Sequence, residues 1–509
     1  MSVIGFRRRL VLPVVNNLVL RMSSCSSYED AVHKLNLLQS NKAALEQVRR
    51  DIKTGKVCTN IEDMENYLSR TGVSMSMLDQ LSVIHVAGTK GKGSTSAMCE
   101  SILRRHGFRT GFYSSPHLVA VRERIQLSGT MLSERQFAEH FHRVYDSLYS
   151  TQAYNGDMPK YFAFLTVLAY NVFLKEKVDV AIVEVGIGGS VDYTNVVRKV
   201  PIVGITSLGL DHTSILGTTL PEIAAAKAGI MKPRCAAYTV QQPPDAMKVL
   251  RTVAAEIPCP LTVAPDFNAY KFSNGIKVLP IDLEAYRTNA SLAIQLAHAW
   301  MRHIKRSNDN TMTNGNEVSN GIIEKANRDN ECNIVTTLPP ETVQGLKECR
   351  WPGRFQVIKT ENVHFYLDGA HTKESMEICA KWFEENNRGR DKVLVFSATG
   401  DRDVEILLRP LRSIKYKKIF FVIPTAHADV NKNQDNYSSV EQKDLIAKCN
   451  NNANIWKNYQ NSDDTKIDVL ECVSDALCSI KDESGISVLM TGSLHLVGAA
   501  LSIINPKLH

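Results

Sequence analysis

Short apolar runs rich in β-branched residues alternate with stretches of helical periodicity along this chain, and this alternation limits the folds open to it. Residues 82–88 and 178–185 have the apolar composition of buried strands, whereas residues 161–175 between them have that of a helix. Strands separated by helices form βαβ units, which build mostly parallel sheets. A second block of the same kind opens at Trp351. We therefore expect an α/β protein with two such sheets.

Composition excludes several classes of protein. The 509 residues are 44% apolar and 22% charged, as in ordinary globular proteins. No run reaches the roughly 18 consecutive apolar residues that predict a membrane-spanning helix, which argues against stable membrane insertion. The net charge of +7 includes four arginines in the first 28 residues, so the remainder carries only +3 and lacks the dense basic stripe of a nucleic-acid scaffold. The eleven cysteines contain no CxxC pair, which favours free thiols in a reducing compartment.

The first 28 residues have the composition of a mitochondrial transit peptide. They contain four arginines, no acidic residue and a serine cluster at the end. A secretory signal is the alternative, although Pro13 interrupts its apolar stretch. Initiation at Met22 instead of Met1 would remove all four arginines and leave a cytoplasmic form.

A glycine-rich turn, HVAGTKGKGST at residues 85–95, lies between a predicted strand and a predicted helix. Backbone N–H groups at a helix N-terminus bind phosphate, and Lys92 would add a positive charge. The turn departs from the Walker A pattern, because Val86 replaces its first glycine and Gly93 its Ser or Thr. A purely structural loop is the alternative to nucleotide binding.

Polar residues follow the other predicted strands of the first block. Ser115, Glu184 and His212, with Asp211 beside it, all fall where parallel strands end, and open α/β sheets bind ligands at that edge. A hydroxyl, a carboxylate and an imidazole could hold Mg²⁺ together with substrate phosphates. Alternatively, Glu184 is a buried ion-paired acid and His212 an ordinary loop histidine.

The second block has polar residues at its strand ends as well. Asp368 and His371 follow one strand, and Ser493 follows another. A cleft between the two blocks is therefore the expected site. Lys227, in the alanine-rich segment AAAKAGI, has small neighbours that would let a ligand or another backbone approach closely; the alternative is a solvated helix lysine.

Nine motifs occur in an order that resembles the eukaryotic folylpolyglutamate synthases, within the Mur ligase superfamily. They are GTKGKGST (88–95), YSSPHLVAVRERI (113–125), VEVGIGGSVDYTN (183–195), SLGLDHTSILG (207–217), AKAGI (226–230), WPGRFQV (351–357), YLDGAHT (366–372), SATGDRD (397–403) and TGSLHLVG (491–498). The departure from Walker A is itself part of that superfamily's pattern. The resemblance implies a Mur-ligase-like P-loop ATPase domain with a mostly parallel sheet, and a smaller Rossmann-like α/β domain.

The resemblance also implies an activity and its residues. Glutamate would be joined to the γ-carboxylate of tetrahydrofolyl-(poly)glutamate through an acyl phosphate, with ATP converted to ADP and phosphate. Its implied ATP-binding residues are Gly91, Lys92, Gly93, Ser94, Arg354 and Asp368; its Mg²⁺ ligands are Ser115, Glu184 and His212; its catalytic residues are Lys227, His371 and Ser493; and its folate-binding residue is Arg124. Lys227 matches a lysine that is carbamylated in relatives. A monovalent cation is a further expected cofactor.

The expected domains follow from these assignments and from composition. We predict a transit peptide at residues 1–27, an ATP-binding P-loop domain at 28–305, a linker or insertion at 306–349 and the Rossmann-like domain at 350–509. The linker begins in an asparagine-rich stretch, 306–331, after a predicted last helix at 289–301. A second asparagine-rich stretch, 450–464, is predicted to be a loop.

Other activities stay open at this point. Dihydrofolate synthase activity, alone or alongside polyglutamylation, uses the same chemistry and differs only in the pterin pocket. A peptidoglycan Mur ligase or a non-catalytic nucleotide-binding protein would keep the fold, but the leader and the complete set of candidate ligands argue against these two. We expect small-molecule substrates, no nucleic acid, a monomer, and mitochondrial and cytoplasmic forms, with peripheral association at the mitochondrial inner membrane.

Overall fold

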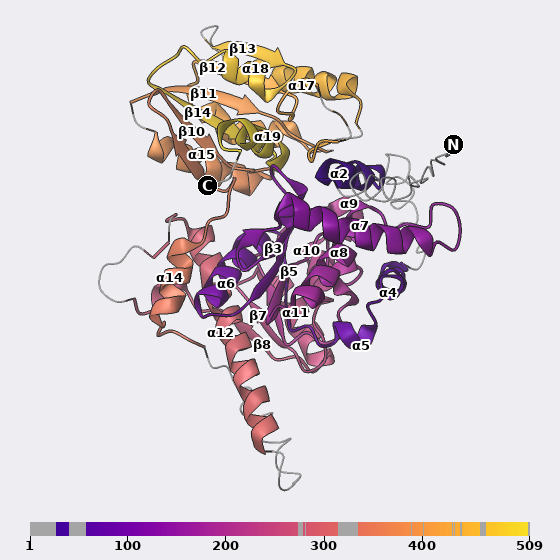
Figure 1. Cartoon of the computed structure of the whole chain (residues 1–509). Coiled ribbons are helices and arrows are strands. Elements are labelled where there is room, and N and C mark those ends of the chain that lie inside the picture. The colour runs from indigo at the N-terminus through magenta and orange to yellow at the C-terminus, as the bar shows by residue number, and fades with distance from the viewer. Residues whose placement is uncertain are drawn as a thin grey trace, which may run out of the picture.

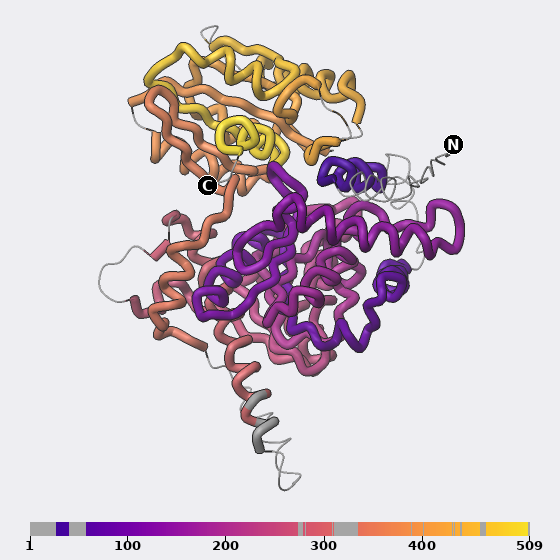
Figure 2. Tube along the Cα trace, viewed as in Figure 1, coloured from indigo at the N-terminus to yellow at the C-terminus, as the bar shows by residue number. Residues whose placement is uncertain are grey.

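The computed structural model describes residues 27–39, 58–272, 278–313 apart from 280, 334–458 apart from six single positions, and 465–506. The predicted transit peptide and Met22 lie outside these residues, except for Ser27. The described chain forms two lobes, each built around one sheet (Figure 1). Figure 2 traces the chain as it passes from the larger lobe to the smaller one after residue 348.

The larger lobe, the first domain, contains an eight-stranded sheet in the order β4-β3-β2-β5-β1-β6-β7-β8. At one edge of the sheet β3 pairs antiparallel with both β2 and β4, and all other neighbouring strands are parallel. Its strands are β1 (Val83–Ala87), β2 (Thr110–Tyr113), β3 (Ile125–Leu127), β4 (Thr130–Met131), β5 (Val180–Glu184), β6 (Ile202–Ile205), β7 (Ala236–Thr239) and β8 (Leu261–Val263).

Helices cover both faces of this sheet because its central strands are apolar on both sides. Alternate residues of β1 belong to different cores: Val83 packs with the helices of one face and Ile84 with those of the other. The first face carries α2 (Tyr28–Leu37), α4 (Asn60–Arg70), α5 (Met75–Leu78), α7 (Glu134–Ser150), α8 (Tyr161–Glu176), α10 (Leu220–Ala228) and α11 (Pro244–Glu256). The second carries α6 (Lys92–Arg105), α12 (Glu284–Thr313) and α14 (Pro340–Glu348). The short α9 (Thr213–Leu216) follows β6.

The smaller lobe, the second domain, contains a six-stranded sheet in the order β13-β12-β11-β14-β10-β9. Only β9 and β10 pair antiparallel. Its strands are β9 (Gln356–Lys359), β10 (Val363–Leu367), β11 (Asp391–Phe396), β12 (Lys418–Val422), β13 (Lys466–Leu470) and β14 (Ile486–Thr491). Its helices are α15 (Lys373–Asn386), α16 (Val404–Leu408) and α17 (Gln442–Lys457) on one face, and α18 (Val473–Cys478) and α19 (Leu494–Ile504) on the other. The predicted fold class, two α/β domains with mostly parallel sheets, is confirmed.

Three local features differ from the expectations. Helix α12 runs from Glu284 to Thr313 and so extends beyond the predicted 289–301; its C-terminal part projects from the first domain (Figure 1). Helix α14 lies within the predicted linker, yet Leu346 is buried in the core against α6. The predicted loop at 450–464 is wrong in its first half, because residues up to Lys457 belong to α17. Among the described residues, no helix has both the length and the apolar character needed to cross a bilayer.

Candidate active site

The glycine-rich turn joins the end of β1 to the beginning of α6. Gly91, the N-cap residue of α6, has φ 89°, in the left-handed region that favours glycine. Gly93 lies in the first turn of the helix, where a Cβ would be 2.8 Å from Trp351 Cζ2. Ser94 follows it and is buried. The N–H groups at the start of α6 have no partner within the helix, as at any helix N-terminus, so this turn can bind an anion.

Two lysines converge on this turn. Lys92 Nζ donates a hydrogen bond of 3.2 Å to the carbonyl oxygen of Gly88, and Lys227 Nζ donates one of 2.9 Å to the same oxygen. Lys227 comes from α10 and is 3% exposed, so it is not a solvated helix lysine. Burial, followed by the charge of Lys92, lowers the pKa of Lys227 to about 7. The structure thus places two lysines beside the turn and lowers the pKa of the buried one toward physiological pH.

The predicted metal ligands lie at the carboxyl ends of neighbouring strands. Glu184 ends β5, which pairs with both β1 and β2, and its Oε2 accepts a hydrogen bond of 3.2 Å from the backbone N–H of Ser115. Burial raises the pKa of Glu184, whereas the charge of Lys92 opposes the rise. His212 caps α9 with φ 51°, and burial lowers its pKa. Glu184 therefore contacts the backbone of Ser115, and His212 lies close enough to Lys92 and Lys227 for their charges to affect it.

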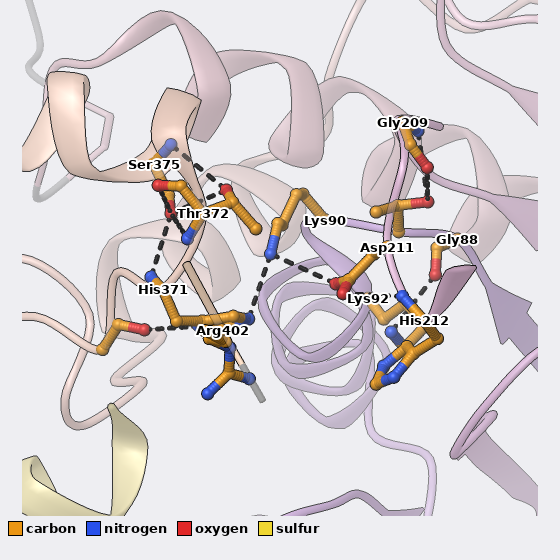
Figure 3. Close-up of polar contacts among 12 residues, drawn as sticks. Gly88, Lys90, Lys92, Gly209, Asp211, His212, His371, Thr372, Ser375 and Arg402 are labelled. Carbon is orange, nitrogen blue, oxygen red and sulfur yellow. Dashed lines mark hydrogen bonds and ion pairs between the residues drawn. The ribbon is translucent and has the colours of Figure 1, made fainter. Parts of the chain in front are cut away.

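A hydrogen-bonded chain connects the two domains (Figure 3). Lys90 Nζ lies 3.4 Å from Asp211 Oδ2 and 3.0 Å from His371 Nε2. His371 Nδ1 lies 2.7 Å from the carbonyl oxygen of Gly369, which can only accept, so Nδ1 carries the proton and Nε2 accepts from Lys90. Burial, with the charge of Lys90, lowers the pKa of His371 to about 3, and burial lowers that of Lys90 to about 8 against the opposing charge of Asp211. Lys90 is thus a charged link between the domains, and His371 is neutral.

The second domain also presents an arginine and an aspartate. Asp368, at the end of β10, accepts hydrogen bonds from the backbone N–H groups of Phe355 at 3.0 Å and Ala370 at 2.9 Å. Burial raises its pKa, and the charge of Arg354 opposes this. The Arg354 guanidinium lies so close to Gly369 that a Cβ there would meet Nη1 at 2.6 Å. Its charge also acts on Glu184 in the first domain, so Arg354 lies near this predicted metal ligand.

Two predicted residues lie in different surroundings. Ser493 is the N-cap of α19; its hydroxyl accepts a hydrogen bond of 3.2 Å from the backbone N–H of Leu496 and is 2% exposed. The contact that the structure assigns to this hydroxyl therefore stabilises the helix. Arg124 Nε donates a hydrogen bond of 2.9 Å to His117 Nδ1, and its guanidinium lies 5.4 Å from the centre of the Tyr161 ring.

No role was predicted for three residues that lie in the site: Lys90, Trp351 and Arg402. Trp351 covers Gly93 and contacts Phe112 edge-on, with ring centroids 5.6 Å apart. Arg402 lies beside His371 in Figure 3 and contributes to lowering its pKa. All three lie within the nine motifs of the sequence analysis, and that position was the feature of the sequence from which a role in the site could have been predicted.

Comparisons with known proteins agree with this geometry. Residues 353–503 match the family model described as dihydrofolate synthetase, C-terminal domain. The mitochondrial folylpolyglutamate synthase of Homo sapiens is 37% identical to this chain over an alignment that covers 94% of the chain and 92% of the relative. The folylpolyglutamate synthase of Neurospora crassa is 35% identical, with 95% of the chain and 92% of the relative covered.

Solved structures share the fold. The crystal structure of folylpolyglutamate synthase from Thermotoga maritima has a TM-score of 0.65 and 24% identity, and the match covers 88% of this chain and 94% of that one. The structure of E. coli FolC in complex with DHPP and ADP has a TM-score of 0.62 and 23% identity, covering 88% and 93%. At these identities the structural matches establish the arrangement of the two domains, whereas the full-length relatives carry the information on family.

Proposed function

We propose the function of this chain from one premise: the chain belongs to the folylpolyglutamate synthase family. It is an ATP-dependent ligase that adds L-glutamate to the γ-carboxylate of tetrahydrofolyl-(poly)glutamate and forms ADP and phosphate. The observation that carries this proposal is the contact between the two domains at Lys90 and His371, which brings the glycine-rich turn of the first domain to the residues that follow β10 in the second. Such an arrangement can hold a nucleotide and a carboxylate together.

The proposed chemistry requires a site that stabilises negative charge. A folate carboxylate attacks the γ-phosphate to give an acyl phosphate, and the amine of glutamate then displaces phosphate from the acyl carbon. Both steps place negative charge near the phosphates, where preorganised positive groups give the largest catalytic effect. Lys92, the N–H groups at the start of α6 and Arg354 from the second domain would bind the phosphates of ATP, together with Gly91, Gly93 and Ser94. Asp368 would help to position the nucleotide.

The incoming glutamate requires a neutral acceptor rather than another cation. His371 Nε2 holds a lone pair that accepts from Lys90. We infer that the amino group of glutamate replaces Lys90 at this nitrogen when the substrate binds. Ser493 stays a predicted catalytic residue on the family's pattern, while its hydroxyl caps α19.

The residues of the first domain suit Mg²⁺ held partly by substrate. In the part of the chain that the structure describes, no three His, Cys, Asp or Glu residues are grouped to form a complete metal cage. Mg²⁺ characteristically binds one or two protein carboxylates together with phosphate oxygens and water, so a single buried carboxylate at Glu184 fits it. We propose that Glu184, His212 and Ser115 hold this ion, which when bound would neutralise phosphate charge. The monovalent cation stays a prediction.

Lys227 is well placed for the proposed carbamylation. The modification needs an unprotonated amine, and a pKa of about 7 provides one at physiological pH. The product would be an anionic oxygen ligand beside the phosphates. The modification would therefore convert this buried amine into an anionic ligand for a second Mg²⁺.

Dihydrofolate synthase activity is the second candidate. The family model that matches residues 353–503 carries that description. The curated relatives that cover nearly the whole chain are folylpolyglutamate synthases and do not favour it. Because the ligation chemistry is shared, the two differ in the pterin pocket, to which we assign Arg124.

Location follows from the same relatives. The human and Bos taurus relatives are named mitochondrial, so we propose a mitochondrial form of this chain. The matrix or inner membrane as its place there, and a cytoplasmic form initiated at Met22, are finer predictions. A fluorescent fusion with Met22 mutated tests the second start, since unchanged dual localisation would contradict it.

A substrate comparison tests the proposed activity. The full chain is incubated with ATP, Mg²⁺ and labelled glutamate, and either tetrahydrofolate or dihydropteroate; products are identified by mass. We expect tetrahydrofolate to gain one or more glutamates with matching ADP release, and Lys227→Ala to lower this turnover by orders of magnitude. Use of dihydropteroate alone would establish the second candidate, and use of neither would contradict the ligase assignment.

A further inference from the structure

A segment of the second domain crosses to the first domain and contacts the loop at residues 116–124, which ends in the predicted folate-binding residue Arg124. This crossing segment, residues 433–437, lies between β12 and α17. Its Gln434 carbonyl oxygen accepts a hydrogen bond of 2.9 Å from Asn36 Nδ2, and Asn433 Oδ1 lies 2.9 Å from His33 Nδ1. Both partners belong to α2, which lies at the junction of the two lobes in Figure 1. The crossing segment therefore anchors the second domain to the first.

Asp435, at the centre of the crossing segment, binds the first domain through its carboxylate and its main chain. Asp435 Oδ1 accepts hydrogen bonds of 2.5 Å from the Tyr28 hydroxyl and 2.6 Å from the backbone N–H of Val121. The Asp435 carbonyl oxygen lies 3.2 Å from His117 Nε2. Val121 and His117 both belong to the loop at residues 116–124, which ends in Arg124.

The contact with His117 reaches Arg124. His117 Nδ1 accepts from Arg124 Nε, which can only donate, so the proton of the ring is on Nε2 and is donated to the Asp435 carbonyl. Burial, followed by the charge of Arg124, lowers the pKa of His117 well below its ordinary value, so the ring stays neutral as this arrangement requires. Tyr161 lies against the other side of the guanidinium. The orientation of Arg124 thus depends on a residue of the second domain.

Asn436 adds two more anchors to the same loop. Its Nδ2 donates to the carbonyl oxygens of Leu118 at 2.8 Å and Val119 at 3.2 Å. The shape of the loop is stabilised separately, because the Glu123 carboxylate accepts from the backbone N–H groups of Leu118, Val119 and Ala120. The internal structure of the loop therefore comes from the first domain, whereas its placement comes from the second.

We propose that Asp435 and Asn436 are positioning residues for folate binding. They hold the loop at 116–124, and through His117 they hold Arg124, in a placement that depends on where the second domain lies. The second domain also carries the predicted nucleotide-binding residues Arg354 and Asp368. A placement of the second domain that brings these two residues to the nucleotide therefore also places Arg124 for folate. Bound nucleotide should then raise the affinity for folate, and bound folate should raise the affinity for nucleotide by the same factor. This inference rests on the proposed function in assigning Arg124 to folate.

Binding and kinetic measurements test the proposal on the full chain. Asp435→Ala and Asn436→Ala each remove contacts to the loop, while Asn433→Ala removes only a contact to α2 and is the matched control. The dissociation constant for tetrahydrofolate is measured by calorimetry with and without a non-hydrolysable ATP analogue, and KM and kcat are measured for each variant. We expect the first two variants to weaken folate binding in the nucleotide complex about tenfold, as loss of one or two hydrogen bonds would, while kcat and the dissociation constant of the ATP analogue without folate stay close to those of Asn433→Ala.

A conservative variant and two contradicting results separate a positioning role of Asp435 from a merely structural one. Asp435→Asn retains an oxygen acceptor for Val121 and should restore most of the folate affinity, even if Asp435→Ala folds poorly. An unchanged folate dissociation constant in both Asp435→Ala and Asn436→Ala, or an equal loss in Asn433→Ala, would overturn the proposal. If the unaltered chain binds tetrahydrofolate without turning it over, the proposed function fails while the binding comparison still decides the role of Asp435.

Discussion

The buried ammonium of Lys227 should destabilise the ligand-free protein in a pH-dependent way. The ordinary pKa of a lysine is 10.5, and burial lowers that of Lys227 to about 7. The unfolded chain therefore binds a proton that the folded chain releases between these two pH values. Protonation of Lys227 favours unfolding, so the destabilisation of the folded protein is fully present below pH 7 and disappears as the pH rises to 10.5.

The size of the effect follows from the shift. At about 1.4 kcal/mol per pH unit, the difference between 10.5 and about 7 corresponds to roughly 5 kcal/mol below pH 7. About 2 kcal/mol of this remains near pH 9. Lys227→Met removes the charge and keeps a similar length. It should therefore raise the free energy of unfolding by about 2 to 3 kcal/mol more near pH 6 than near pH 9.

Urea unfolding at both pH values measures this difference. The buffer contains no Mg²⁺, nucleotide or bicarbonate, so that neither a ligand nor carbamylation alters Lys227. Lys248→Met is the control, because Lys248 is on α11 of the same domain and is exposed; it should show no such pH difference. A gain for Lys227→Met that is equal at both pH values, or larger near pH 9, would refute the electrostatic reasoning.

Three other substitutions test separate parts of the site. Gly93→Ala places a Cβ 2.8 Å from Trp351 and should lower the free energy of unfolding by about 1 to 3 kcal/mol, measured by thermal unfolding. Gly209→Ala is the control, because nothing lies within 4 Å of a Cβ there, and it should change the stability little. Equal effects of the two substitutions would contradict the packing argument. Glu184→Gln should raise the Mg²⁺ concentration needed for half-maximal turnover, and an unchanged titration would return Glu184 to a structural role. Lys90→Met removes a positive charge beside the glycine-rich turn and should lower kcat by about 10 to 100-fold in steady-state assays; wild-type turnover would show that this charge is dispensable.

The fold was predictable because the central strands are short apolar runs bounded by glycine and polar residues. In parallel sheets the carboxyl ends of neighbouring strands meet at one edge, so Glu184 and Ser115 could be placed together from their positions alone. The glycine-rich turn was equally clear, since a buried strand precedes it and a helix follows.

Composition misled the prediction for α17. Its high asparagine content is typical of a loop, but four of its residues are buried at helical spacing on one face: Cys449, Asn452, Ala453 and Trp456. That periodicity was present in the sequence and outweighs the low intrinsic helix preference of asparagine, because packing decides the structure of such a segment.

Contacts between the domains could not be predicted from sequence patterns. Lys90 and His371 are separated by 281 positions, and Val121 and Asp435 by 314. Periodicity reports on one helix or strand and carries no information on how two domains are oriented. The hydroxyl of Ser493 illustrates a related limit, because its position after β14 is equally compatible with a helix cap and with catalysis.

The central claim is that the two domains bring the γ-phosphate of ATP and a folate carboxylate together so that an acyl phosphate forms. Transfer of oxygen measures this most directly. The full chain is given ATP, Mg²⁺, glutamate and tetrahydrofolate whose γ-carboxylate is labelled with oxygen-18, and the released phosphate is analysed by mass. The account predicts one labelled oxygen in each phosphate for each glutamate added. Glutamylated product with unlabelled phosphate would contradict it.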